Sequence, residues 1–374
     1  KRQGVTTLTS ARPVKLQNVT ITGPDGALLQ DVGISVRPTI RLSGEGIRIN
    51  YRDLRVTGQS QQLLSAGGTV TLPAGENNPV SADGRLVADV QALSRQPLVA
   101  RALQGDVESP VRLEATYKLA HGAGGIDLDR LSANLFYEDE QPRVSLTADS
   151  RVRIRTQLGS RQSELGRARG KVTLAVINLT PDPFSSILEA NGLSFTEANG
   201  RAVLSSDGKS LRIDTVEPFI AKGVKLGAAG KPLLDAFTLV ADTETVMLGN
   251  ALHSQVKQLE VTFDKRPQQP AINATVDVKL KGQGASTWVE DLTANANMQL
   301  PALLDQPGLL PGHRLTAGEM TAVARLDASG RLESTARVQG LKSNKELPLE
   351  LLELQLNGQL DENGSFDVQA PLLT

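Results

Sequence analysis

Strict alternation of apolar and polar residues runs through most of this chain. The clearest example is Ile272 to Lys281, where every second residue is aliphatic. Shorter stretches of the same kind extend from Val19–Thr22 near the start of the sequence to Leu352–Asn357 near its end. Successive side chains of a β-strand point to opposite faces of the sheet, so a period of two predicts strands with one apolar and one polar face.

Turn signals separate the alternating stretches. Hairpin turns that need a positive φ favour Asp-Gly, Asn-Gly and Ser-Gly pairs. Such pairs occur in the segments Pro24–Gly26, Ala82–Gly84, Ser206–Gly208, Ala328–Gly330 and Glu362–Gly364. Because short turns join antiparallel neighbours, the sequence predicts a mainly β fold, an antiparallel meander of roughly twenty strands.

Three segments depart from the alternation and predict a few short helices. They are Ala92–Leu103, which is broken at Pro97, Pro181–Ala190, and Pro301–Leu310, which is interrupted at Pro307. Proline and aspartate at the start of a segment suit the first turn of a helix, and an internal proline ends or kinks it. Each segment follows one alternating stretch and precedes another.

This shared context indicates an internal repeat. Strand, helix, strand, turn and strand recur around residues 86–122, 172–208 and 292–330. Repeats of such length favour an elongated architecture that grows by stacking. We therefore expect residues 1–374 to form one elongated repeating region.

The composition excludes several classes of function. Lysine and arginine number 40 against 41 aspartates and glutamates, so no basic excess points to a nucleic-acid partner. The chain has no cysteine, which rules out disulfides, thiolate metal sites and cysteine nucleophiles. Aromatic residues make up only 3% of the sequence, whereas a membrane barrel carries aromatic girdles. The absence of cysteine also fits a periplasmic location.

Residues that could carry chemistry are scattered. His121, His253 and His313 stand alone, without the spacing of a metal site. The acidic run Glu138–Glu140 either binds a cation or forms a solvated hairpin tip, and the hairpin is favoured. The basic segment Gln162–Lys171 is either a charged strand edge or a contact with a membrane or partner. We expect no enzyme active site, no cofactor and no metal.

An alternating sheet must hide its apolar face. It could stack as a sandwich, close as a barrel, wind as a solenoid, or curl into a trough that holds an apolar guest. The ring-poor, smoothly aliphatic composition favours a curled, taco-like groove for acyl chains. Candidate residues for the lining of this groove are the inward aliphatics Ile154, Leu174, Leu239, Val261, Val276, Val278, Leu326 and Leu354.

Three sequence segments resemble those of a known protein family. They are Gly200–Gly208 (GRAVLSSDG), Asp291–Leu304 (DLTANANMQLPALL) and Leu315–Leu332, which begins LTAGEMTAV. In these phrases the chain resembles the AsmA-like and TamB-like family of Gram-negative bacteria, which are bridge-like lipid transfer proteins. The resemblance implies a periplasmic β-groove, tethered to the inner membrane by an N-terminal helix, that moves phospholipids towards the outer membrane.

The resemblance also implies partners. They are phospholipid acyl chains in the groove, and the inner and outer membranes or their proteins at its ends. No anchor helix occurs in this sequence, so we expect a fragment of a longer membrane-anchored protein. The alternative reading is a structural or adhesive cell-envelope protein built of β-sandwich modules, and compact protease-resistant modules would distinguish it from the groove.

Overall fold

The computed structural model describes most of the chain. The described residues are 4–23, 26–59, 61–75, 78–103, 105–122, 125–148, 151–154, 168–228, 231–249, 251–282, 288–307, 315–343, 349–360 and 366–369. The fold is mainly β, with 72% strand and 9% helix, and its strand pairings are antiparallel. The predicted fold class, antiparallel β with a few short helices, is therefore confirmed, whereas the curled groove remains a prediction.

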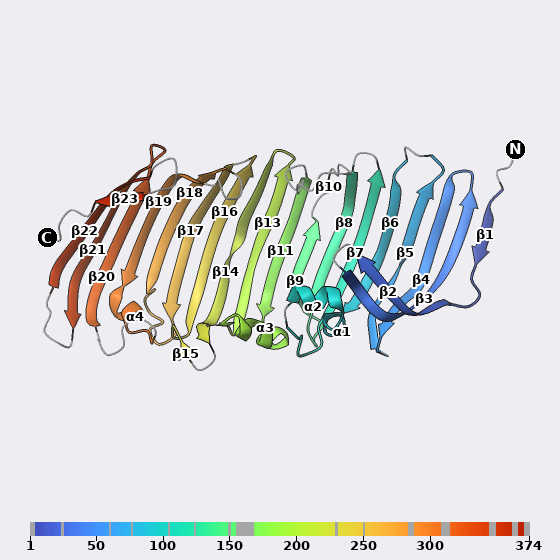
Figure 1. Cartoon of the computed structure of the whole chain (residues 1–374), viewed down its shortest axis with the longest axis horizontal. Helices are drawn as coiled ribbons and strands as arrows, with labels where there is room; N and C mark the ends of the chain where they lie inside the picture. The colour runs from blue at the N-terminus through green and yellow to red at the C-terminus, as the bar shows by residue number, and fades with distance from the viewer. Residues whose placement is uncertain are drawn as a thin grey trace. The chain divides into compact units, whose positions relative to one another are not determined.

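The chain divides into two units, which are described one at a time. Unit 1 comprises Lys1–Leu188 and Leu204–Gly208, and unit 2 comprises Glu189–Val203 and Lys209–Thr374. In Figure 1 the strands of unit 1 run from blue to green and those of unit 2 from yellow-green to red.

Unit 1 is a meander in which most strands pair with the next strand along the chain. Its strands are β1 (Thr6–Thr9), β2 (Val14–Gly23), β3 (Gly26–Ser43), β4 (Gly46–Gly58), β5 (Gln61–Pro73), β6 (Val80–Asp89), β7 (Arg112–Gly122), β8 (Gly125–Phe136), β9 (Pro142–Ala148), β10 (Val152–Ile154) and β11 (Arg169–Leu179).

Two long strands of unit 1, β3 and β8, each pair with two shorter strands along one edge. β1 and β2 pair one after the other along one edge of β3, while β4 pairs along the opposite edge. In the same way β9 and β10 share one edge of β8, and both then pair with β11. A meander of this kind brings strands that are close in sequence side by side and keeps one face of the sheet on one side throughout.

Unit 2 is a second meander. Its strands are β12 (Leu193–Ser194), β13 (Glu197–Asp207, whose end falls in the range of unit 1), β14 (Ser210–Ala228), β15 (Lys231–Pro232), β16 (Phe237–Leu248), β17 (Ala251–Phe263), β18 (Ile272–Lys281), β19 (Trp288–Gln299), β20 (Leu315–Leu326), β21 (Arg331–Ser343), β22 (Leu349–Leu360) and β23 (Phe366–Gln369). From β16 to β23 every strand pairs with its successor, and β14 pairs with β16.

Short helices form in all three predicted segments. They are α1 (Val90–Ser94), α2 (Pro97–Leu103), the 3₁₀ turn η2 (Asp182–Phe184), α3 (Ser185–Ala190) and α4 (Leu300–Leu304). Asp89 caps α1 by accepting a hydrogen bond from the backbone N–H of Ala92 at 2.9 Å. Pro97 opens α2, a position where its missing N–H costs nothing. Residues 308–310 of the third segment lie outside the described residues.

The turn predictions have mixed outcomes. Gly208 and Gly330 each lie between two strands, as expected, and both have a positive φ, although Ser206 and Asp207 still belong to β13. The prediction of a turn at Ala82–Gly84 is wrong, because these residues lie inside β6 and pair with β5 and β7. The other two segments include residues outside the described ranges.

Each unit has its buried core beside a helix. In unit 1, Ala92 of α1 packs with Val32, Val56 and Leu63, which come from β3, β4 and β5. In unit 2, Ala302 of α4 packs with a larger set, Val224, Phe237, Phe263 and Ala271. The helices therefore cover the apolar side of the strands at one end of each sheet, where Figure 1 shows α1 beside α2 and, in unit 2, α4.

Candidate functional site

The apolar face of unit 2 consists of rows of aliphatic residues that run across the strands. Residues that pair in register lie side by side on the same face, so each row can be followed from strand to strand. The central row is made of alanine from β18 to β21, and the row beside it carries larger side chains. These rows are Ala274–Ala296–Ala322–Ala336 and Ile272–Met298–Met320–Val338.

Among the residues that the structure describes, no second close-packed layer seals this face. The aliphatic residues of β18, which are Ile272, Ala274, Val276, Val278 and Leu280, all remain partly exposed. In the core of a β-sandwich such residues would be fully buried between the two sheets. The open face of β18 therefore leaves room for an apolar guest.

Unit 1 carries a face of the same kind. One row joins Val56, Leu64, Ala88 and Leu113 from β4 to β7. A second row crosses six strands, from β5 to β9 and on to β11, and consists of Ala66–Leu86–Ala115–Ala133–Leu146–Leu174. The polar residues of the same strands, such as Arg85 and Glu114, point to the opposite face and form an ion pair at 2.6 Å.

The apolar face of unit 2 is covered at one end of the strands and open at the other. Phe237 and Phe263 lie at the end next to α4, where their rings pack edge to face with centroids 6.0 Å apart. They are 5% and 2% exposed, whereas Met247, at the other end of β16 on the same face, is 41% exposed. The helix therefore closes one rim of the face and leaves the opposite rim accessible.

The predicted lining residues lie in these rows. Leu239 and Val261 pair with each other and pack against the core cluster beside α4. Val276 and Val278 lie on the open part of the face and are partly exposed, and Leu174 occupies the corresponding kind of position in unit 1.

The other three predicted lining residues are not placed on the open part of a face. Leu326 is 6% exposed, so its side chain packs within unit 2 and offers little surface to a guest. Ile154 pairs in register with Ile126, and Leu354 with Ala336, but their side chains lie outside the described part of the structure.

On the polar faces, ion pairs connect side chains of neighbouring strands. Lys257 lies 3.2 Å from both Asp214 and Glu244, and hydrogen bonds to these carboxylates raise the pKa of the lysine. In unit 1, hydrogen bonds from Arg153 and Arg151 lower the pKa of Asp127 and Asp129, respectively. Exposed pairs of this kind add little stability singly, but they keep the outer face hydrated and the two faces distinct in polarity.

A row that the sequence did not reveal crosses the apolar face of unit 1. Tyr51 of β4, Gly68 of β5, Gly84 of β6 and Tyr117 of β7 pair in register. The two tyrosine hydroxyls meet above the glycines, 2.7 Å apart. Burial, followed by the hydrogen bond to Tyr117, raises the pKa of Tyr51 above its ordinary value.

A second feature missed by sequence reasoning is a repeated motif at the helices. Ala92–Pro97 (ALSRQP) and Ala302–Pro307 (ALLDQP) share the pattern Ala-Leu-X-X-Gln-Pro. The glutamine is buried in both copies, and its side-chain oxygen accepts a hydrogen bond from a backbone N–H of an adjacent segment. Gln96 accepts from Gln30 at 2.9 Å, and Gln306 accepts from Asp235 at 2.7 Å.

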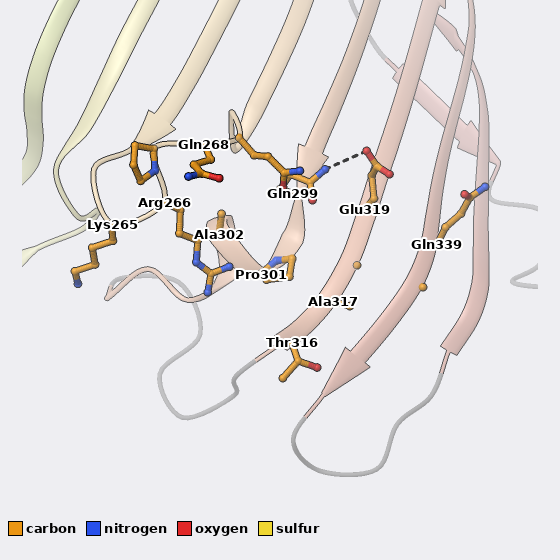
Figure 2. Close-up of a pocket in the computed structure, with 14 residues that line it drawn as sticks. Lys265, Arg266, Gln268, Gln299, Pro301, Ala302, Thr316, Ala317, Glu319 and Gln339 are labelled. Carbon is orange, nitrogen blue, oxygen red and sulfur yellow. Dashed lines mark hydrogen bonds between the residues drawn. The ribbon is translucent and has the colours of Figure 1, made fainter.

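Polar hollows lie next to these helices. In unit 2 a hollow of about 1100 Å³ is bounded by residues that follow β17, by the start of α4 and by the ends of β20 and β21. Figure 2 shows Gln299 and Glu319 joined by a hydrogen bond across it, 3.0 Å long. Arg266, which also lines this hollow, forms an ion pair with Asp305 at 2.9 Å. A smaller hollow of about 420 Å³ lies beside Asp89 in unit 1.

The scattered polar residues named from the sequence have ordinary surroundings. Glu138–Glu140 lies exposed between the paired strands β8 and β9, as the hairpin interpretation requires. His253 is exposed and lies 2.7 Å from Asp277, and His121 is an exposed residue of β7. His313 lies outside the described residues, as does much of Gln162–Lys171. Within the described ranges, no three side chains among His, Asp and Glu are grouped to hold a metal.

Comparison with protein-family models, curated proteins and solved structures gives no match to this chain. The fold and the apolar faces therefore carry the functional argument by themselves. Among the described helices, none has the length and apolar character needed to span a membrane.

Proposed function

We propose that this chain holds the acyl chains of phospholipids on its apolar sheet faces and works as a periplasmic carrier or conduit between the inner and outer membranes. The observation that carries the proposal is the partial exposure of long aliphatic rows, above all the row of four alanines from Ala274 to Ala336. The resemblance to AsmA-like and TamB-like proteins points the same way.

Exposure of the apolar faces to water is unfavourable, and an apolar guest would relieve it. Soluble proteins rarely leave a contiguous apolar patch larger than a few hundred Å² in contact with water. Transfer of an acyl chain from water to such a surface contributes about 0.8 kcal/mol for each methylene group. The row of small alanines lies beside a row of longer aliphatic side chains, Ile272, Met298, Met320 and Val338. Such an aliphatic surface suits a hydrocarbon chain.

The direction of the rows supports movement of the guest along the sheet. Each row runs across the strands, so a chain lying in it contacts equivalent aliphatic groups from one strand to the next. Release into water at any point would expose the whole chain, whereas a shift by one strand keeps it covered. Head groups would remain hydrated at the rim that the helices leave open, where Met247 lies.

The proposal is tested by mass spectrometry of lipids that co-purify with the chain after expression in the periplasm. Ala296→Asp places a carboxylate in the alanine row of unit 2, and we expect it to lower the bound lipid severalfold. Asn297→Asp is the matched control, because Asn297 is the next residue of β19 and lies exposed on the polar face. Circular dichroism checks that both variants fold. A wild-type chain that carries no phospholipid would overturn the proposal.

A further inference from the structure

The tyrosine pair is a polar interruption of the aliphatic face of unit 1. The rows on either side of it are aliphatic, with Ile49, Val70, Ala82 and Leu119 on one side. On the other side Ala66 pairs with Leu86, which pairs with Ala115. The hydroxyls of Tyr51 and Tyr117 therefore place hydrogen-bonding groups in the middle of a surface otherwise suited to hydrocarbon.

Two glycines make this arrangement possible. A Cβ atom on Gly68 would lie 2.7 Å from the hydroxyl oxygen of Tyr51. A Cβ atom on Gly84 would lie 3.1 Å from the hydroxyl oxygens of both tyrosines. Since both glycines lack this atom, the two side chains reach towards each other across β5 and β6 and rest on the backbone. The pair is thus built into the floor of the face.

Counting hydrogens shows that the pair has one donor to spare. Each tyrosine hydroxyl carries a single hydrogen and can also accept. At 2.7 Å one hydroxyl donates to the other, which leaves the second hydrogen without an acceptor among the hydrogen bonds found for these two groups in the described residues. A hydrogen-bond donor in an apolar setting gains free energy when a guest supplies an acceptor.

Unit 2 provides an internal comparison. Gly84 lies five residues before Asp89, the cap of α1, and Ala294 lies five residues before Gln299, the cap of α4. The row through Ala294 consists of Val256–Val276–Ala294–Ala324. These four residues are aliphatic, so this position of the repeat carries no tyrosine pair from β17 to β20. Unit 2 has a hydroxyl pair in a different row, where Thr245 and Ser254 lie 2.9 Å apart and Ser254 pairs with Val278.

We propose that the Tyr51–Tyr117 pair is a binding point for the ester carbonyl of an acyl lipid, whose tails lie on the aliphatic rows beside it. This inference rests on the proposed function and adds a chemical preference to it. The carbonyl oxygen of an ester is a good hydrogen-bond acceptor, whereas the corresponding ether oxygen is a weak one. Unit 1 should therefore favour ester-linked over ether-linked phospholipids of the same length.

The test compares short-chain diacyl phosphatidylcholine with its dialkyl ether analogue, using the full chain with Ala296→Asp to weaken the site of unit 2. We expect the ester lipid to bind roughly three- to tenfold more tightly than the ether lipid, the value of one net hydrogen bond. Tyr51→Phe combined with Tyr117→Phe should abolish this preference. Either single substitution should preserve it, because one hydroxyl remains free to donate.

Two further measurements make the test decisive. The infrared band of the ester carbonyl should shift to lower frequency on binding to the wild-type chain and should not shift with the double variant. Tyr137→Phe is the control, because the Tyr137 hydroxyl donates to the carbonyl oxygen of Thr180 at 2.7 Å, and it should leave the preference unchanged. Equal binding of both lipids to the wild-type chain would overturn the inference alone, whereas binding of neither would overturn the proposed function.

Discussion

At the scale of single residues, two neighbouring glycines of β5 differ in whether the fold requires them. A Cβ atom on Gly68 would lie 2.2 Å from the carbonyl oxygen of Asp83, a backbone atom that cannot move aside easily. A Cβ atom on the preceding residue, Gly67, would meet only the carbonyl oxygen of Tyr51 at 3.8 Å, an ordinary contact. The first glycine is therefore required by close packing of neighbouring strands, and the second is not.

These neighbours give a paired prediction. Gly68→Ala should destabilise the chain by about 1–3 kcal/mol, because overpacking forces the backbone of β5 and β6 apart. Gly67→Ala should be neutral or slightly stabilising, since alanine loses less conformational entropy on folding than glycine does. Urea unfolding followed by circular dichroism measures both. Equal destabilisation by the two substitutions would show that the close contact at Gly68 is not the cause.

The tyrosines predict how stability depends on alkaline pH. Burial raises the pKa of Tyr51, and burial also raises the pKa of Tyr137, to about 12, from the ordinary value of 10.0. In the unfolded chain both groups ionise near the ordinary value, so their contribution is complete below pH 10 and is lost as the pH rises towards 12. Absorbance at 295 nm should show delayed ionisation in the folded chain, and Tyr137→Phe should reduce the delayed fraction. Ionisation of every tyrosine near pH 10 in the folded chain would contradict this.

At the scale of elements, the buried glutamines fasten the helices to neighbouring segments: Gln96 to β3, and Gln306 to the connection before β16. Gln306 follows α4, accepts from the N–H of Asp235 and donates to the carbonyl oxygen of Ala302 at 2.7 Å. Gln306→Ala would leave that N–H without its partner, at a cost of about 1–3 kcal/mol. Hydrogen exchange should show faster exchange at Asp235, while the exposed Gln268→Ala should leave it unchanged. Unchanged exchange at Asp235 in Gln306→Ala would exclude the fastening role.

Much of this element structure could be predicted from the sequence because its signals are local. The period of two in Ile272–Lys281 became β18, and the break in alternation before Pro97 became α1 and α2. The Asp-Gly pair ending at Gly84 gave a wrong turn prediction, because this dipeptide also occurs inside strands. In β6 the glycine at position 84 serves cross-strand packing, since it leaves room for the two tyrosine hydroxyls.

The tyrosine row could not be predicted, because it depends on register. The pairing of β4 with β5 shifts between Tyr51 and Leu54, next to the row. Each such bulge moves every later residue to a new partner, and its position follows from contacts between strands rather than from the order of residues. The shared Ala-Leu-X-X-Gln-Pro motif, in contrast, was present in the sequence and could have been found by comparing its segments.

At the scale of the whole molecule, the essential feature is the separation of polarity between the two faces of each sheet. In each unit the rows on one face are aliphatic over several strands, while the opposite face is lined by ion pairs such as Lys279 with Asp291 at 2.9 Å. The helices cover the apolar face at one end of the strands only. An exposed apolar face of this kind favours an apolar guest, and this is the basis of the proposed lipid function.

The most direct test is photocrosslinking along one strand. A photoreactive amino acid is placed in turn at each position from Ile272 to Lys281 of β18, in cells, and lipid adducts are identified by mass spectrometry. We predict adducts at Ile272, Ala274, Val276 and Val278 and none at Asn273, Thr275 or Lys279, so that crosslinking alternates with the strand. Uniform crosslinking, or no lipid adduct at any position, would contradict a lipid-binding face.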